Sequence, residues 1–134
     1  MNNQLVKEES WASYDTFEFP NVRIYLKPKI NSDEEFQKFL DDWEALYKRE
    51  EKFILYFDTT DVGMVSMKYC FKMRSFIRRL KSDYPRFLEK SYIKVKSRWV
   101  RYLLSFIFFM EKPVAPVYLY SGTIEEGRFS VYNP

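Results

Sequence analysis

Four short segments with the residue pattern of β-strands recur along the chain, and longer helical segments separate them. Residues 21–27, NVRIYLK, alternate apolar and polar side chains, which is typical of a strand with one exposed face. Residues 52–58, KFILYFD, are apolar on both parities and predict a central buried strand. Residues 91–97 and 117–120 predict two further strands. Strands that alternate with helices indicate an α/β fold in which right-handed crossovers join parallel neighbours.

Three helices are predicted between these strands. The first begins at Ser32, which opens the S-x-x-E spacing of a capping box, and ends near Arg49. The second covers residues 66–84, because Pro85 disfavours helical backbone in the residue before it. The third covers residues 98–111.

Length and composition fit one domain over residues 1–134. The chain is 46% hydrophobic and 20% aromatic, which is enough for a packed core. We expect residues 1–20 to add an edge strand or to cover the sheet. We expect residues 121–134 to form a hairpin-prone or irregular tail.

The composition removes many enzyme classes. The sequence contains no histidine, so neither a triad with an imidazole base nor a His-ligated zinc site can be written. Its three glycines form neither a GxGxxG turn nor a P-loop. Asp58 and Asp61 follow the central strand, where α/β sheets often bind ligands, but turn-forming aspartates are more frequent there. We therefore expect a protein that is not an enzyme, with no catalytic residue, metal ion or cofactor.

The expected location is the cytoplasm. No segment approaches the roughly 18–20 apolar residues that a membrane-spanning helix needs. The N-terminal residues MNNQLVKEES lack the apolar segment of a secretory signal, and the lone Cys70 cannot form an internal disulfide.

The stretch FILYFDTTDVGMVS, followed by a long helix that ends in SDYP, a strand, a helix and PVYLY, resembles the CRAL-TRIO lipid-binding domain family. The elements that carry the resemblance are Asp58 at the end of the central strand, the pair Tyr84-Pro85, and the pair Tyr92-Ile93. Full lipid-transfer members also have an N-terminal helical bundle and a gate helix, and the passage MEKPVAPVYLY leaves room for neither. The nearer comparison is with short CRAL-TRIO-like domains that serve in protein contacts and membrane recruitment.

The related SpoIIAA-like fold of the STAS domains has a similar core. Its signature, Asp-Ser-Ser-Gly at the start of the helix after the central strand, includes a serine that is phosphorylated in bacterial anti-sigma-factor antagonists. Met67 stands at the matching position here, and we interpret Ser66 as a simple helix N-cap. The two resemblances imply a SpoIIAA-like, mostly parallel sheet of four to five strands, with helices packed mainly on one face.

If the apolar parity of each strand faces the helices, the opposite face of the sheet carries tyrosines and cations. The predicted binding residues of this face are Arg23, Tyr25, Lys27, Tyr92, Lys94, Lys96, Tyr118 and Tyr120. Tyrosine offers contact area with a polar tip and lysine offers charge, so such a face can bind a flat or anionic ligand. Alternatively, aromatic residues of the two termini cover the face, and the tyrosines are then ordinary packing.

The third predicted helix is apolar nearly all round, which indicates either burial or contact with a partner. One stripe contains Trp99, Tyr102, Leu103, Phe106, Phe109 and Met110, and the other contains Val100, Leu104, Ile107 and Phe108. We predict that the second stripe contacts a second copy of the chain, another protein or a membrane surface. Burial of the helix by the tail is the alternative.

Charge is distributed unevenly along the chain. Residues 68–101 contain 12 Lys and Arg against 2 Asp and Glu, which raises affinity for phosphates on lipid headgroups or nucleic acid. Acidic side chains of the first helix can also complement these cations. We therefore expect a non-enzymatic binding module that contacts a protein partner, a second copy or an anionic membrane surface. The alternatives are a lipid or small hydrophobic ligand, and single-stranded nucleic acid bound on the tyrosine and lysine face.

Overall fold

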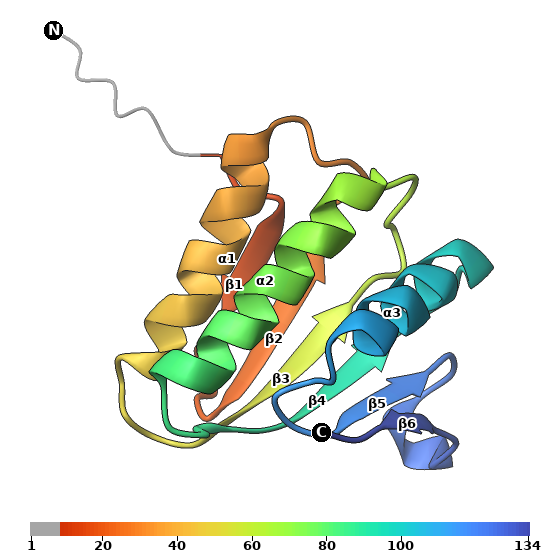
Figure 1. The fold of residues 1–134 in the computed structure, drawn as a ribbon. Helices are drawn as coiled ribbons and strands as arrows, with labels where there is room; N and C mark the ends of the chain where they lie inside the picture. The colour runs from red at the N-terminus through yellow and green to blue at the C-terminus, as the bar shows by residue number, and fades with distance from the viewer. Residues whose placement is uncertain (1–8) are drawn as a thin grey trace, which may run out of the picture.

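Residues 9–134, which the computed structural model describes, form an α/β structure with one mixed sheet (Figure 1). The strands are β1 (Ala12–Asp15), β2 (Asn21–Leu26), β3 (Phe53–Asp58), β4 (Leu88–Lys94), β5 (Val117–Tyr120) and β6 (Ser130–Tyr132). The helices are α1 (Asp33–Tyr47), α2 (Met67–Asp83) and α3 (Arg98–Met110), with a 3-10 helix η1 at Ile124–Glu126. Every strand and helix predicted from periodicity is present, and the boundaries shift by no more than three residues.

The six strands lie side by side in chain order. Strands β2 to β5 pair in parallel, whereas β1 and β6 pair antiparallel at the two edges. The predicted mostly parallel sheet of four to five strands is therefore corrected to a mixed sheet of six. The added strands lie in the first 20 residues and in the tail after residue 120, where short connections permit only antiparallel pairing.

All three α-helices lie on the same face of the sheet (Figure 1). Each parallel strand is added on the same side of the preceding one, so right-handed crossovers bring every connecting helix to one face. We call the opposite face the open face. Among residues 9–134, no helix combines the length and the apolar character needed to cross a membrane.

The strand side chains that point toward the helices form the core. Exposure is 6% or less at all seven positions assigned to this side from the sequence, which are Val22, Ile24, Leu26, Ile93, Val95, Val117 and Leu119. Phe53, Leu55 and Phe57 of β3 complete the layer. The buried and exposed sides of β2, β4 and β5 were therefore assigned correctly.

The helix starts also follow the sequence. Ser32 is the N-cap of α1, and its Oγ accepts a hydrogen bond from the Glu35 N–H at 3.2 Å. The return bond of the capping box is displaced by one residue, because the Glu35 carboxylate accepts from the Asn31 N–H at 3.1 Å. Ser66 is the N-cap of α2, as predicted.

Two aromatic residues at β1, Trp11 and Tyr14, pack on the helix side of the sheet. Trp11 is buried, its Nε1 donates to the Lys27 carbonyl at 2.8 Å, and its ring meets Phe39 edge-on. The Tyr14 hydroxyl donates to the Phe39 carbonyl at 2.7 Å. Within the described residues, the N-terminal segment therefore closes one edge of the core and does not cover the open face.

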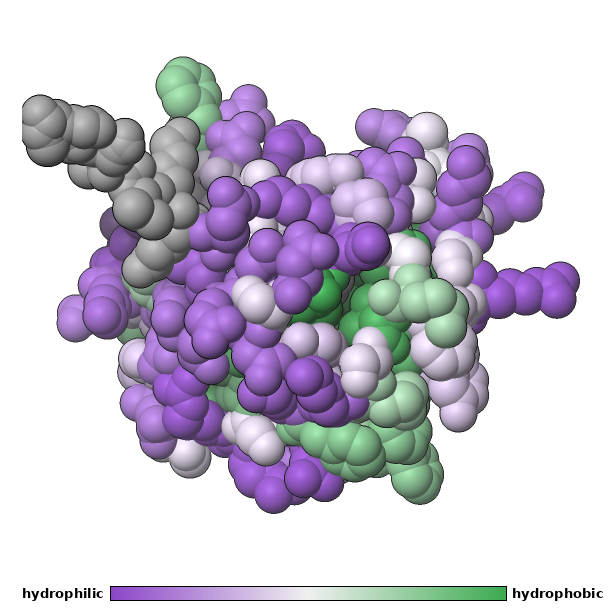
Figure 2. Space-filling view, turned by 90° about the horizontal axis from the view of Figure 1, so that it is seen from above, coloured by the Kyte–Doolittle hydropathy of each residue, from purple (hydrophilic) through white to green (hydrophobic). Residues whose placement is uncertain are grey.

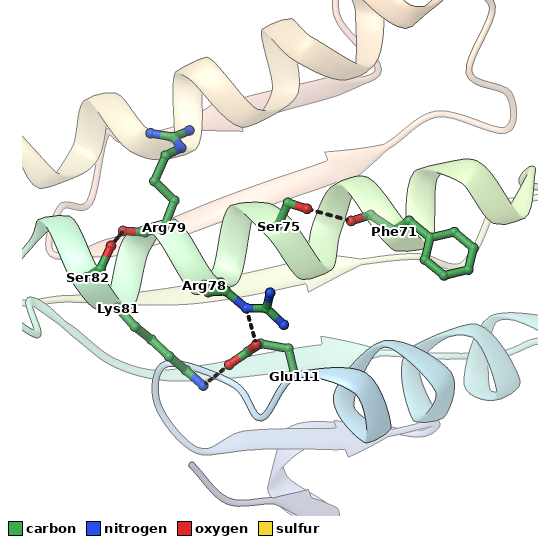
Figure 3. A network of polar contacts seen from close by, with 7 residues as sticks. All are labelled: Phe71, Ser75, Arg78, Arg79, Lys81, Ser82 and Glu111. Carbon is green, nitrogen blue, oxygen red and sulfur yellow. Dashed lines mark hydrogen bonds and ion pairs between the residues drawn. The ribbon is translucent and has the colours of Figure 1, made fainter.

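Glu111, the residue after α3, connects this helix to α2 (Figure 3). Its two carboxylate oxygens accept from Lys81 Nζ at 2.7 Å and from Arg78 Nε at 2.9 Å. These hydrogen bonds, that from Lys81 first, lower the pKa of Glu111 below its ordinary value. The carboxylate thereby neutralises part of the positive charge on α2.

We predict that Glu111→Gln lowers the free energy of unfolding at pH 7 by about 0.5–1 kcal/mol, the range of a partly exposed ion pair. The pKa of Glu111 is lowered in the folded state, so its contribution is present above the unfolded-state pKa of about 4.3 and is lost as the pH falls through the folded-state pKa. Urea unfolding of both proteins across this range measures the difference. Glu89→Gln, at an exposed glutamate of β4, is the control, and an equal effect of both substitutions at every pH would contradict the prediction.

Candidate functional site

Six of the eight predicted sheet-face residues lie on strands at the open-face parity. They are Arg23 and Tyr25 on β2, Tyr92 and Lys94 on β4, and Tyr118 and Tyr120 on β5. Lys27 and Lys96 have the same parity but lie just beyond the ends of β2 and β4. The predicted surface is thus brought together by three strands.

Three tyrosines form a stacked row across the open face. Tyr56, Tyr92 and Tyr118 lie opposite one another in the parallel register of β3, β4 and β5. The Tyr56 and Tyr92 ring centroids are 5.3 Å apart with 13° between the planes, and those of Tyr92 and Tyr118 are 5.2 Å apart with 25°. Tyr56 was missed from the sequence, because KFILYFD is apolar on both parities and no exposed face was assigned to it.

Further groups occupy the remaining ring surfaces of this row. The Arg23 guanidinium lies 5.3 Å from the Tyr56 centroid. Phe129 from the C-terminal segment contacts Tyr92 and Tyr118, at 5.8 Å and 5.6 Å between centroids. Each tyrosine of the row therefore stacks on a neighbouring tyrosine, and both faces of the Tyr92 ring are covered by neighbouring rings.

A shallow groove of about 480 Å³ lies on the open face, toward the carboxyl ends of the parallel strands. The polar side chains that line it are Ser13, Asp15, Arg23, Tyr25, Tyr56, Asp58, Lys94 and Tyr120. Carboxylates and cations are mixed in this lining, so it has no dominant charge.

The pKa values of two tyrosine hydroxyls in the groove are raised above the ordinary value. The hydrogen bond from the Tyr25 hydroxyl to Asp61 Oδ2, at 2.8 Å, raises the pKa of Tyr25. Burial, followed by the charge of Asp58, raises the pKa of Tyr120. Asp58 in turn accepts from the Thr60 N–H at 2.9 Å, which is the turn-forming role expected for this residue. Among residues 9–134, no group of three His, Cys, Asp or Glu side chains is arranged to hold a metal ion.

The stripe of α3 that was predicted to contact a partner points into the protein. Val100 and Ile107 are only 5% and 8% exposed. Leu104 and Phe108 are half-buried and pack against the core. Val100 and Ile107 are therefore closed to a partner, whereas Leu104 and Phe108 keep part of their surface exposed. Periodicity identified two apolar stripes on this helix, but it could not determine which one faces the sheet.

Two residues of the other stripe of α3, Tyr102 and Phe109, are exposed near Phe71 of α2, whereas Leu103 is buried and Trp99, Phe106 and Met110 are half-buried. Phe109 is 86% exposed, Tyr102 56% and Phe71 43%. The Phe71 ring meets Phe106 edge-on at 5.9 Å, and Trp99 stacks on Tyr102 at 5.7 Å. We call Phe71, Trp99, Tyr102, Phe106 and Phe109 the outer patch.

Some cations lie beside the outer patch, whereas other cations in residues 68–101 form ion pairs with acidic residues of α1. Arg79 pairs with Glu44 of α1, and Lys68 pairs with Asp33, as the complementary charges of these helices suggested. Helix α3 contains two arginines and no acidic residue. The Arg74 guanidinium lies 5.5 Å from the centre of the Phe71 ring. The surroundings of the outer patch on α2 and α3 are therefore cationic.

Comparisons with models of protein families, with curated proteins and with solved structures find no match to the chain. The resemblance to CRAL-TRIO and STAS-type domains therefore stays a prediction.

We predict that Tyr92→Leu lowers the free energy of unfolding by about 0.5–1.5 kcal/mol, because leucine retains apolar area but loses the two stacked contacts. A double-mutant cycle with Tyr56→Leu isolates the stacking contribution of that pair. Phe17→Leu, at a ring that is 94% exposed, is the control. Strictly additive effects of the two tyrosine substitutions would contradict the stacking interpretation.

Proposed function

We propose that this protein is a non-enzymatic binding module that contacts an anionic membrane surface or a protein partner through the outer patch. The observation that carries the proposal is the exposure of three large aromatic side chains, Phe71, Tyr102 and Phe109, on adjoining helices. Contiguous exposed apolar surface commonly marks a site of protein or membrane contact.

The chemistry of the outer patch fits an anionic partner. Aromatic side chains are favoured at the centres of protein interfaces and at membrane surfaces, because they combine large area with few rotatable bonds. Arg98 lies in the first turn of α3 next to Trp99, whereas the Arg101 guanidinium donates to Ser130 Oγ of β6 at 3.4 Å. Cations next to inserted aromatic residues add attraction to anionic headgroups or to an acidic protein surface.

We also propose that the fold is of the SpoIIAA-like type found in STAS and short CRAL-TRIO-like domains. Supporting this are the alternating order of strands and helices, the position of the helices on one face, and the motif residues Asp58, Tyr84 and Pro85. Contact with proteins and membranes is the role that this resemblance implies.

Binding of single-stranded nucleic acid to the open face is the weaker candidate. Such binding depends on aromatic faces that are free to stack on bases. Tyr92 has a ring on both sides, and the outer side of Tyr56 faces Arg23. The cations of this face could still contact phosphates, but the row of tyrosines offers little stacking area.

We predict that the wild-type protein co-sediments with vesicles containing phosphatidylserine at low salt and that Phe109→Asp weakens this binding at least about tenfold. Burial of one phenylalanine contributes about 1.5–3 kcal/mol, and the new carboxylate also repels the anionic surface. Phe17→Asp makes the same change at a ring 94% exposed near β1, at the opposite edge of the sheet from α3. Equal binding by the two variants would exclude the outer patch as the membrane contact.

Light scattering coupled to size exclusion tests the protein-contact form of the proposal. If the outer patch joins two copies of the chain, the wild-type protein has the mass of a dimer and Tyr102→Asp has the mass of a monomer. The exposed position of Tyr102 means that this substitution should leave the fold intact, which circular dichroism checks. A wild-type monomer that also fails to bind anionic vesicles would leave only a different protein as the partner.

A further inference from the structure

An apolar cavity of about 120 Å³ lies between the sheet and the three helices α1, α2 and α3. Its walls include Leu104, Ile107 and Phe108 of α3, the residues that the sequence suggested as a partner contact. Protein interiors are close-packed, and voids larger than a water molecule are few. A cavity of this size in a chain of 134 residues therefore needs an explanation.

Two small residues on the floor of the cavity explain why it stays open. Ser91 lies at an inward-facing position of β4 and is 3% exposed, and Ala115 lies just before β5 and is 1% exposed. The neighbouring inward positions carry the larger side chains of Leu55 and Val117. The space is thus a consequence of residue size at two positions in the sheet layer.

A second cavity of about 80 Å³ adjoins the first. The two cavities share lining residues, among them Leu104, Ile107 and Thr59. Val62 and Val100, which line only the second one, lie near the carboxyl ends of β3 and β4. Viewed over this end of the sheet, hydrophobic side chains are visible in a hollow, with hydrophilic side chains to its left and above it (Figure 2).

The lining of the larger cavity contains one unsatisfied hydrogen-bond donor. Trp43 lines the cavity and is 8% exposed, and its indole Nε1–H has no hydrogen-bond partner among the described residues. Thr59, a polar neighbour in the lining, already donates to the Lys94 carbonyl at 2.6 Å. The indole nitrogen itself has almost no accessible surface, so the walls that a ligand would touch are almost entirely apolar.

We infer that this cavity binds a small uncharged apolar molecule. No charged side chain lines the cavity, so an ionised ligand would lose its hydration without compensation. Apolar cavities of about 150 Å³ are large enough for benzene. The cavity of about 120 Å³ is slightly smaller, so a six-membered ring or a short alkyl chain is near the upper limit of what it can hold, and a whole phospholipid is too large.

The test is titration of ¹⁵N-labelled protein with cyclohexanone, observed through the three indole N–H resonances. The Trp43 resonance should shift until it saturates. The Trp99 resonance should not move, because Trp99 lines neither cavity. A Trp43 resonance that stays in place at the solubility limit of cyclohexanone would overturn the inference.

Variants distinguish this cavity from the outer patch. Ala115→Leu fills the cavity and should weaken cyclohexanone binding at least tenfold. If the larger leucine side chain prevents folding, Ser91→Val fills part of the same cavity with a smaller change in volume. Phe109→Ala removes a ring of the outer patch and should leave this binding unchanged. Unaltered binding in both cavity variants would contradict the assignment, whatever the result of the vesicle experiments.

Discussion

The order in which parallel strands are added determines most of this structure. Strands β2 to β5 are neighbours in chain order, and each crossover is made by a single helix. Because such crossovers are right-handed, α1, α2 and α3 lie on one face of the sheet. Successive side chains of each of these strands therefore alternate between the buried core and the open face. The core, the open face and the outer patch all follow from this division.

The two layers use their aromatic residues differently. On the open face, Tyr56, Tyr92 and Tyr118 stack on one another, so the face is stabilised from within and offers few free ring surfaces. On the helix layer, Phe109 has most of its surface exposed. The surface on which an external partner would gain most is therefore the outer patch, even though both surfaces contain aromatic side chains and cations.

Helix α3 connects the two proposed binding activities. Its inner stripe lines a cavity, and its outer stripe carries Trp99, Tyr102, Phe106 and Phe109. Glu111 holds the end of the helix against α2 through Arg78 and Lys81. The helix is thus fixed at its end by charge, while part of its inner stripe borders empty space.

The sequence by itself determined the four parallel strands, the three helices, the N-cap residues Ser32 and Ser66, and the side of the sheet to which the residues of β2, β4 and β5 point, because these depend on local periodicity and backbone preference. It could not determine the two edge strands, the stacking of Tyr56 on Tyr92, the orientation of α3 or the cavity above Ser91. These depend on which side chains meet across elements far apart in the chain. A helix that is apolar on both sides has no local signal for its inner face, so only packing against the sheet decided it.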